Sequence, residues 1–377
     1  MPQQEPGQPP GSLSAAPRVT QGPAPAGRKP RRPDAALRVV VAAGVALALA
    51  SIGARAAAWG GPGTLPAGLR ALVGAGLAVL LALTALRAAG RDGPAPLPAV
   101  LAWTPYAAPA ALVLLLLAVA GHLPLAAAVA VPLLTVQLAW LAPRFGAEPT
   151  QAAAGPRLRV MVANVLVGGA GAGAVAAAVR AERPDLLALV ELTPELATAL
   201  DGTDLAELLP FQALDARAHP GGVGIYARRP LDGAGPLGGT HLPCHRAAVE
   251  LDGGHLVGVL AVHASPPRPG TTELWRGDLE AIRAAAARHA EPLVLAGDFN
   301  ATADHASFRA LTDAGLRDAH DARGRGLVRT WPAQGPLPPL LHLDHVLVSP
   351  DLAVLAVRER AIRGSDHRAV VADLALR

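Results

Sequence analysis

Apolar positions follow two different patterns along the chain, and the change falls near Pro156. Before it, long runs of Ala, Leu and Val carry few charges; after it, short apolar runs end in polar residues. With 377 residues the chain also exceeds the usual size of one compact domain. The pattern predicts a disordered basic tail over residues 1–35, a transmembrane helical region over 36–145 and a globular domain over 156–377.

Four apolar runs make up the predicted helical region. They cover residues 39–54, 71–86, about 99–120 and 123 to about 142. The last two are long enough to cross a bilayer, which takes about 20 residues. The first two are shorter and have arginines beside them, so we expect short spans, or one interfacial segment. Ionisable residues are nearly absent from the runs, which favours an anchor over a transporter.

The two parts of the chain also differ in charge. Residues 1–155 contain 11 Lys/Arg and 4 Asp/Glu, a net +7, whereas residues 156–377 contain 22 and 25, a net −3. The positive charge therefore lies in the membrane half, where it predicts that the tail stays inside the cell. A dedicated nucleic-acid binder would carry this charge on its globular domain, so that class of protein is not favoured. Four spans would return the globular domain to the cytoplasm and three would leave it outside. Arg87 and Arg91, between the second and third runs, favour four.

Continuous apolar runs in the globular domain indicate strands that are covered on both faces. Strands are predicted over 158–163, 185–190, 293–296, 341–348 and 369–374, with a helix over about 174–181. The only cysteine, Cys244, is expected to be a small apolar strand residue.

The start of this domain also fits a dinucleotide-binding unit, because a strand, a glycine-rich loop over 168–173, a helix and a second strand follow one another. The glycines are loosely spaced, and Ala176 stands where the third is expected. Acids further along the chain decide against this alternative, since hydride transfer has no use for so many.

Polar residues stand at the ends or edges of the predicted strands. They are Asn164, Glu191, Asp298, Asn300, Asp344 and Asp366. In the hydrolysis of a phosphate ester, an oxyanion attacks a group that is itself negatively charged. A hard cation such as Mg²⁺ or Mn²⁺ must therefore offset the charge on the phosphoryl oxygens. Glu191 and Asp366 are the candidate metal ligands. Asp298 is the candidate for orienting or deprotonating water.

The remaining polar residues fit supporting roles. Asp344 and His367 can form an acid–imidazole pair that stabilises negative charge in the transition state. The amides of Asn164 and Asn300 can hold ligands or phosphate without adding charge. As the alternative, Asp298 and Asn300 merely cap a helix that follows Thr302. No role is expected for His241, His245, His305, His342 and His345.

The segment from about 157 to 377 resembles the endonuclease/exonuclease/phosphatase superfamily, which has the deoxyribonuclease-I-like fold. The resemblance rests on motifs in the family's order, namely Asn164, Val190-Glu191, Gly221-Gly222-Val223-Gly224-Ile225-Tyr226, Val262-His263, Gly297-Asp298-Phe299-Asn300, Asp344-His345 and Ser365-Asp366-His367. It implies a four-layer α/β/β/α sandwich of two mixed sheets, with the site where their strand ends meet. It also implies that Glu191 is the principal metal ligand, that Asp366 is a possible second metal contact and that His263 contacts phosphate.

Two departures weaken a nuclease interpretation more than they weaken phosphoesterase chemistry. Many relatives have Gln where this chain has Val190, and nuclease branches often have a polar residue where it has Leu166. The chain further resembles bacterial membrane-anchored members, whose catalytic domain is commonly outside the cytoplasm, in conflict with four spans. We therefore expect a multi-pass enzyme in the cell membrane that hydrolyses a lipid-linked or small phosphorylated substrate on the outer face. A tethered nuclease and a non-catalytic membrane binding module are the alternatives.

Overall fold

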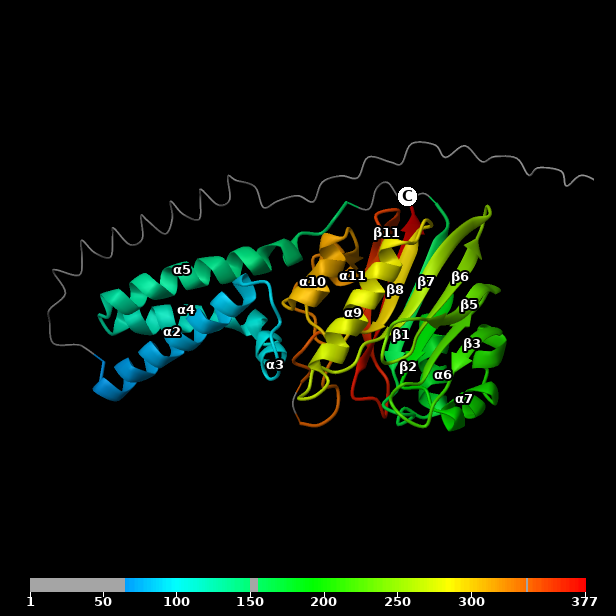
Figure 1. The fold of residues 1–377 in the computed structure, drawn as a ribbon, viewed down its shortest axis with the longest axis horizontal. Helices are drawn as coiled ribbons and strands as arrows, with labels where there is room; N and C mark the ends of the chain where they lie inside the picture. Colours follow the sequence, from blue (N-terminus) through cyan, green and yellow to red (C-terminus); the bar gives the residue numbers. More distant parts are fainter. Residues whose placement is uncertain (1–64, 150–154, 337) are drawn as a thin grey trace, which may run out of the picture.

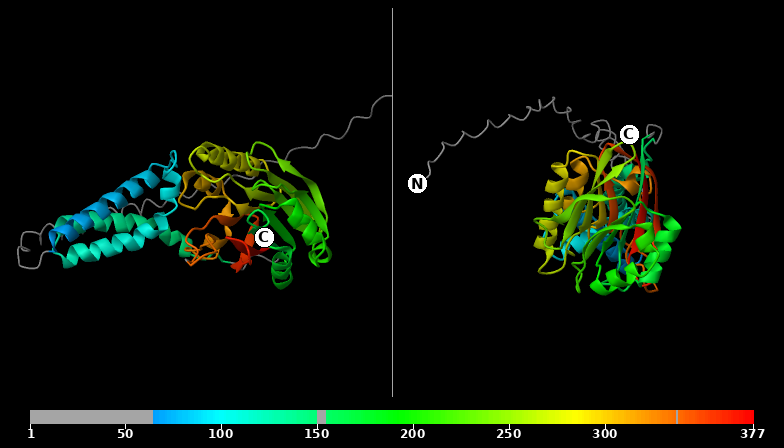
Figure 2. Two further views of the ribbon diagram at one scale, coloured as in Figure 1. Left: turned by 90° about the horizontal axis from the view of Figure 1, so that it is seen from below. Right: turned by 90° about the vertical axis from the view of Figure 1, so that its right-hand side faces the viewer.

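The computed structural model describes residues 65–149, 155–336 and 338–377, which form a bundle of helices beside an α/β sandwich (Figure 1). The tail expected over 1–35 and the apolar run over 39–54 lie outside the described residues. The left view of Figure 2 shows the bundle projecting from one side of the sandwich, and in the right view the bundle lies behind the sandwich. The two parts are called the helical region (residues 67–145) and the sandwich (residues 157–377).

The helical region contains three helical segments that are long and apolar enough to cross a membrane: 67–88, 97–120 and 124–145. Its elements are α2 (Ala67–Ala88), α3 (Leu97–Leu101), η1 (Thr104–Tyr106), α4 (Ala107–Ala120), α5 (Pro124–Leu141) and η2 (Ala142–Phe145). The run expected over 71–86 is part of a longer helix of 22 residues that includes Arg70 and Arg87. Length and composition are therefore compatible with a membrane protein.

The sandwich consists of two six-stranded sheets, with strand orders β11-β12-β1-β2-β4-β3 and β5-β6-β7-β8-β10-β9. The strands are β1 (Arg157–Asn164), β2 (Leu186–Val190), β3 (Phe211–Asp215), β4 (Val223–Ala227), β5 (Leu231–Leu237), β6 (Cys244–Leu251), β7 (His255–His263), β8 (Leu293–Asp298), β9 (Arg317–Asp318), β10 (Asp344–Val348), β11 (Leu352–Ala361) and β12 (Arg368–Leu376). Both sheets are mixed, because β1 with β2 and β7 with β8 pair in parallel whereas the other neighbours are antiparallel.

Helices cover the outer face of each sheet and complete four layers, which confirms the predicted α/β/β/α sandwich. The helices of the sandwich are α6 (Ala172–Glu182), α7 (Pro194–Asp201), α8 (Leu205–Leu208), α9 (Thr272–Ala287), α10 (Ala306–Asp313) and α11 (Ala319–Ala322). Strand β2 shows why the strands are apolar throughout. Leu186 and Ala188 face the core between the sheets, while Leu187 and Leu189 pack under α6 and α7.

The strand register brings polar residues from both sheets to one end of the sandwich. Asn164 and Val190 are paired at the ends of the parallel strands β1 and β2. In the second sheet, Asp298 at the end of β8 pairs with Asp344 on one side and with His263 on the other. The candidate residues are therefore held by backbone ladders and not by loops alone.

One predicted strand is shorter than expected. Strand β10 begins at Asp344, whereas the apolar pattern predicted a start at residue 341. The preceding residues turn away because Leu341 forms a bridge with Trp331. The Thr330 hydroxyl also accepts hydrogen bonds from the backbone N–H groups of Leu343 and Asp344, at 3.1 and 3.2 Å.

Buried polar contacts join the helical region to the sandwich. Arg87 Nε at the end of α2 lies 2.7 Å from Asp304 Oδ1, and Arg144 Nη2 in η2 lies 2.8 Å from the same oxygen. His305 Nε2 is 2.8 Å from the Pro98 carbonyl oxygen. Asp92 Oδ1 and Oδ2 accept hydrogen bonds from backbone N–H groups in the first turn of α10. We call this set of contacts the junction.

Candidate active site

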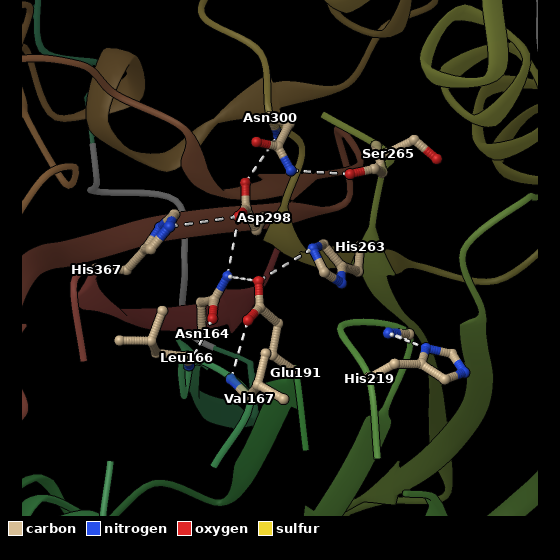
Figure 3. A network of polar contacts seen from close by, with 12 residues as sticks. Asn164, Leu166, Val167, Glu191, His219, His263, Ser265, Asp298, Asn300 and His367 are labelled. Carbon is tan, nitrogen blue, oxygen red and sulfur yellow. Dashed lines mark hydrogen bonds and ion pairs between the residues drawn. The ribbon is translucent and has the colours of Figure 1, made fainter. Parts of the chain in front are cut away.

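The first sheet contributes an amide and a carboxylate that touch each other. Asn164 Nδ2 donates hydrogen bonds to Glu191 Oε1 at 3.0 Å and to Asp298 Oδ2 at 3.2 Å, so one amide links the two sheets (Figure 3). The backbone N–H of Val167 donates to Glu191 Oε2 at 3.0 Å. The backbone N–H of Leu166 donates to Asn164 Oδ1, which orients the amide. Both groups are thereby fixed before any ligand binds.

The backbone around these contacts is unusual. Leu166, Val167, Glu191 and Asn300 all have positive φ, at 51°, 47°, 61° and 47°. Non-glycine residues rarely adopt this left-handed conformation, and least of all β-branched ones such as Val167. Here it turns the Val167 N–H toward the Glu191 carboxylate. Such outliers commonly cluster at functional sites.

The second sheet contributes Asp298 and Asn300 in a tight turn. Asp298 Oδ1 accepts the backbone N–H of Asn300 at 2.8 Å, and Asn300 Nδ2 donates to the Ala264 carbonyl at 2.9 Å. Helix α10 begins at Ala306, and its first N–H groups are capped by Asp92 of the helical region. The alternative in which Asp298 and Asn300 cap this helix is therefore wrong.

Asp344 and His367 form the predicted acid–imidazole pair. His367 Nδ1 lies 2.8 Å from Asp344 Oδ2, and His367 Nε2 lies 3.7 Å from Asp298 Oδ2. Burial lowers the pKa of His367, but the Asp344 and Asp298 carboxylates outweigh it and raise this pKa to about 10. The ring is thus an imidazolium whose second N–H faces Asp298.

Asp366 and His263 complete the predicted set. Asp366 Oδ2 accepts the Trp331 Nε1–H at 3.1 Å, whereas its Oδ1 has no hydrogen-bond partner among the described residues. His263 Nε2 lies 3.8 Å from Glu191 Oε1, and burial lowers the pKa of His263. The structure therefore brings together all the residues that the sequence predicted for the site, although their roles stay predictions.

The donor set suits a hard divalent cation. Burial raises the pKa values of Glu191 and Asp298, and the neighbouring carboxylates of Asp366 and Asp344 act in the same direction to a smaller extent. A cation would relieve this cost, and the Glu191 carboxylate and the Asp366 Oδ1, which has no hydrogen-bond partner among the described residues, offer the oxygen ligands that Mg²⁺ prefers. Asp298, Asp344 and His367 also place donor atoms within 4.8 Å of one another. Because its pKa is raised to about 10, the His367 ring carries a proton on both nitrogens and offers no lone pair to a cation.

Sequence reasoning missed several supporting residues. Ser365 Oγ donates to the Asn164 carbonyl at 2.6 Å and accepts the backbone N–H of His367 at 2.9 Å. Its place beside Asp366 could have suggested this role. Trp331 carries no such signal, because it lies 35 residues from the carboxylate that it contacts and follows no apolar strand.

Several solved structures are similar to part of this chain. The chain resembles, in fold, an endonuclease/exonuclease/phosphatase structure from Beutenbergia cavernae, with 23% identity, a TM-score of 0.48 and coverage of 59% of this chain and 72% of that one. Humanized TDP2 of D. rerio shows 17% identity and a TM-score of 0.49, and the match covers 58% of this chain and 98% of that one. The human Nocturnin catalytic domain with bound sulfate shows 18% identity and a TM-score of 0.46, and the match covers 59% of this chain and 94% of that one.

A search of curated proteins found no match. Residues 161–367, more than half of the chain, match the sequence profile of the Endonuclease/Exonuclease/phosphatase family. This confirms the resemblance inferred from the ordered motifs. The chain belongs to the endonuclease/exonuclease/phosphatase family.

Proposed function

We propose that the protein is a membrane-anchored phosphoesterase that uses Mg²⁺ or Mn²⁺ to hydrolyse a phosphate mono- or diester. Members of its family are metal-dependent phosphoesterases or nucleases. One observation carries the proposal: the Asp298 carboxylate lies between the Asn164 amide and the His367 imidazolium, with Glu191 on the other side of Asn164. Acids, amides and one imidazolium at a common point fit the hydrolysis of an anionic ester.

The residues divide into proton-handling and positioning roles. Asp298 has a raised pKa and lies at the site's centre, so its carboxylate can orient a water molecule and accept its proton. Asp344 holds His367 with one ring N–H directed into the site, where it stabilises charge on the phosphoryl oxygens. Asn164 and Asn300 fix the Asp298 carboxylate from both sides.

The carboxylates of Glu191 and Asp366 would hold the divalent ion, and His263 beside Glu191 would contact the phosphate. When bound, the ion supplies positive charge that offsets the charge of the phosphate ester. Trp331 positions Asp366 by donating to Oδ2 and leaves Oδ1 free to bind.

The substrate that we propose is a lipid-linked or small phosphorylated molecule. The sandwich carries the slightly acidic half of the chain, which does not favour a polyanion such as DNA. The described helices also support an anchor in the lipid bilayer, since three segments are long and apolar enough to span it. We propose that the sandwich lies outside the cytoplasm, which requires that these three segments cross the bilayer and that the run over 39–54, outside the described residues, does not.

Hydrolysis by the full-length protein in detergent micelles tests this proposal. Phospholipid substrates, a soluble phosphomonoester and plasmid DNA are each incubated with Mg²⁺, and again after addition of EDTA. We expect Mg²⁺-dependent release of phosphate or of a phosphorylated headgroup, and a loss of about 10³-fold in Asp298→Asn, which keeps the shape but removes the base. Asp313→Asn, at an exposed acid, is the matched control.

Each result has a defined meaning. Cleavage of plasmid alone would identify a tethered nuclease and overturn the proposed substrate class. No metal-dependent activity on any phosphoester, from protein with intact structure, would favour a non-catalytic binding module. Equal turnover by wild type and Asp298→Asn would remove Asp298 from the mechanism.

A further inference from the structure

A second buried cluster of histidine and carboxylate groups lies outside the active site. Asp318, His320 and His342 place donor atoms within 4.8 Å of one another. Asp318 ends β9, His320 lies in α11 and His342 lies in the segment that leads to β10. The proposed catalytic mechanism uses none of the three.

His320 has the hydrogen bonding of a metal ligand. Its Nε2 lies 3.0 Å from Glu359 Oε1, and Arg325 holds the other oxygen of that carboxylate. Its Nδ1 has no hydrogen-bond partner among the described residues, although the side chain is only 1% exposed. Metal-binding histidines usually donate one ring N–H to a carboxylate, which directs the other nitrogen's lone pair at the metal.

Asp318 is oriented from two directions. Its Oδ2 lies 2.6 Å from His345 Nδ1, and its Oδ1 accepts the backbone N–H of His320 at 2.7 Å. His345 is itself fixed, because its Nε2 lies 2.9 Å from the Ala301 carbonyl. The carboxylate is therefore held close to the free nitrogen of His320, at 3.7 Å from Oδ1.

His342 supplies the third donor and a route of access. Its Nε2 is buried and has no hydrogen-bond partner among the described residues. The residue is half-buried and, with Asp318 and Asp321, lines a cavity of about 90 Å³ between the sandwich and the helical region.

We propose that Asp318, His320 and His342 form a second metal site, which binds Zn²⁺ or a similar borderline divalent ion. Two imidazole nitrogens and one carboxylate oxygen match the ligands of zinc, whereas the oxygen-rich active site suits a harder ion. The site would tie α11 to the segment that delivers Asp344, and a water molecule or the nearby Asp321 would fill the remaining position.

Zinc binding by the full-length protein in detergent tests the proposal. Titrations with Zn²⁺ in excess Mg²⁺, and the visible absorption spectrum with Co²⁺, report the site independently of catalysis. We expect one zinc equivalent in wild type, and binding weakened about 100-fold or more in His342→Ala and His320→Gln. His255→Ala, at an exposed histidine, should bind zinc as the wild type does.

Two further measurements separate loss of a ligand from loss of structure. In EDTA, wild type and His342→Ala should unfold at similar temperatures, and added Zn²⁺ should raise the unfolding temperature of the wild type alone. Asp298→Asn should keep the zinc equivalent, since this residue belongs to the active site. Equal zinc affinity in wild type, His342→Ala and His320→Gln would overturn the proposal, as would the absence of zinc binding by the wild type.

Discussion

The helical region and the sandwich are built from the same apolar residues but direct them to opposite sides. Leu125 is 84% exposed and Leu116 is 59% exposed on the outside of the bundle, whereas every residue of β2 is fully buried. The hydrophobic effect favours both arrangements if the surroundings of the bundle are themselves apolar. The comparison shows that an apolar face can be predicted to be buried only where the protein is surrounded by water. In a lipid bilayer the same pattern is compatible with an exposed face.

The two regions meet at the junction, where the helical region places polar groups inside. Arg87 and Asp304 are buried there beside the partly buried Arg144. The Arg87 guanidinium also lies over the Trp140 ring, 3.9 Å from its centre. Asp304 lies in the loop that leaves β8 just after Asp298 and Asn300. The junction therefore holds the segment that carries the candidate catalytic acid.

The largest expected effect is confined to the sandwich. His367→Gln removes the imidazolium that faces Asp298, so turnover should fall by about 10²- to 10⁴-fold. The helical content measured by circular dichroism should stay the same. The control His255→Gln should hydrolyse substrate at the wild-type rate. If His367→Gln kept more than about a tenth of the wild-type kcat, the role of the acid–imidazole pair would be wrong.

The second largest effect is expected on the free energy of unfolding, from a substitution that breaks the junction between the two regions. Asp304→Ala leaves Arg87 and Arg144 buried without their carboxylate, which should lower the free energy of unfolding by about 3–5 kcal/mol. Denaturant unfolding in detergent measures this difference. Asp252→Ala removes the 80% exposed partner of Arg229 and should cost less than about 1 kcal/mol. Equal effects of the two substitutions would mean that the junction does not hold the two regions together.

A third change tests the outer face of the bundle. Leu116→Arg places a charge on the exposed side of α4, where the proposed bilayer would lie. Membrane insertion should become less favourable by about 3 kcal/mol, as measured by the fraction of protein recovered in carbonate-washed membranes. The control Leu116→Ile should insert normally. If Leu116→Arg also inserted fully, this face of α4 would not contact lipid.

The smallest expected effect is the pH dependence of the junction. Burial lowers the pKa of His305 below 6.5, although the Pro98 carbonyl and the Asp92 and Asp304 carboxylates act in the other direction. The unfolded chain binds a proton below pH 6.5 that the folded chain does not bind, so stability is lost as the pH falls below this value. In His305→Gln the loss between about pH 7 and pH 5 should be smaller. Parallel pH profiles of the two proteins would contradict this prediction.

Several residues of the site were predictable because they lie at the end of an apolar run, which is a local feature of the sequence. Asn164 and Asp298 end strands β1 and β8, and Glu191 directly follows β2. The family's order of motifs was enough to predict that these three residues lie close together. Their supporting contacts were not predictable, since nothing in the local pattern connects Trp331 to Asp366.

The junction also escaped sequence reasoning. The apolar pattern places Arg87 at the flank of a short run, and Arg87 does lie in the last turn of α2. Its partner Asp304, 217 positions later, could not be predicted from that pattern. His305 received no role for the same reason, as its partner Pro98 lies 207 positions earlier. Contacts across such distances follow from the packing of two completed regions and not from periodicity.

The left-handed backbone at Val167 has a consequence for engineering. Glycine at this position would relax the chain, because it adopts positive φ without the clash of a branched side chain. A more flexible backbone would also no longer hold the N–H of residue 167 in place against the Glu191 carboxylate. A screen for thermal stability alone would therefore select glycine at this position. A screen that also measures turnover would retain valine.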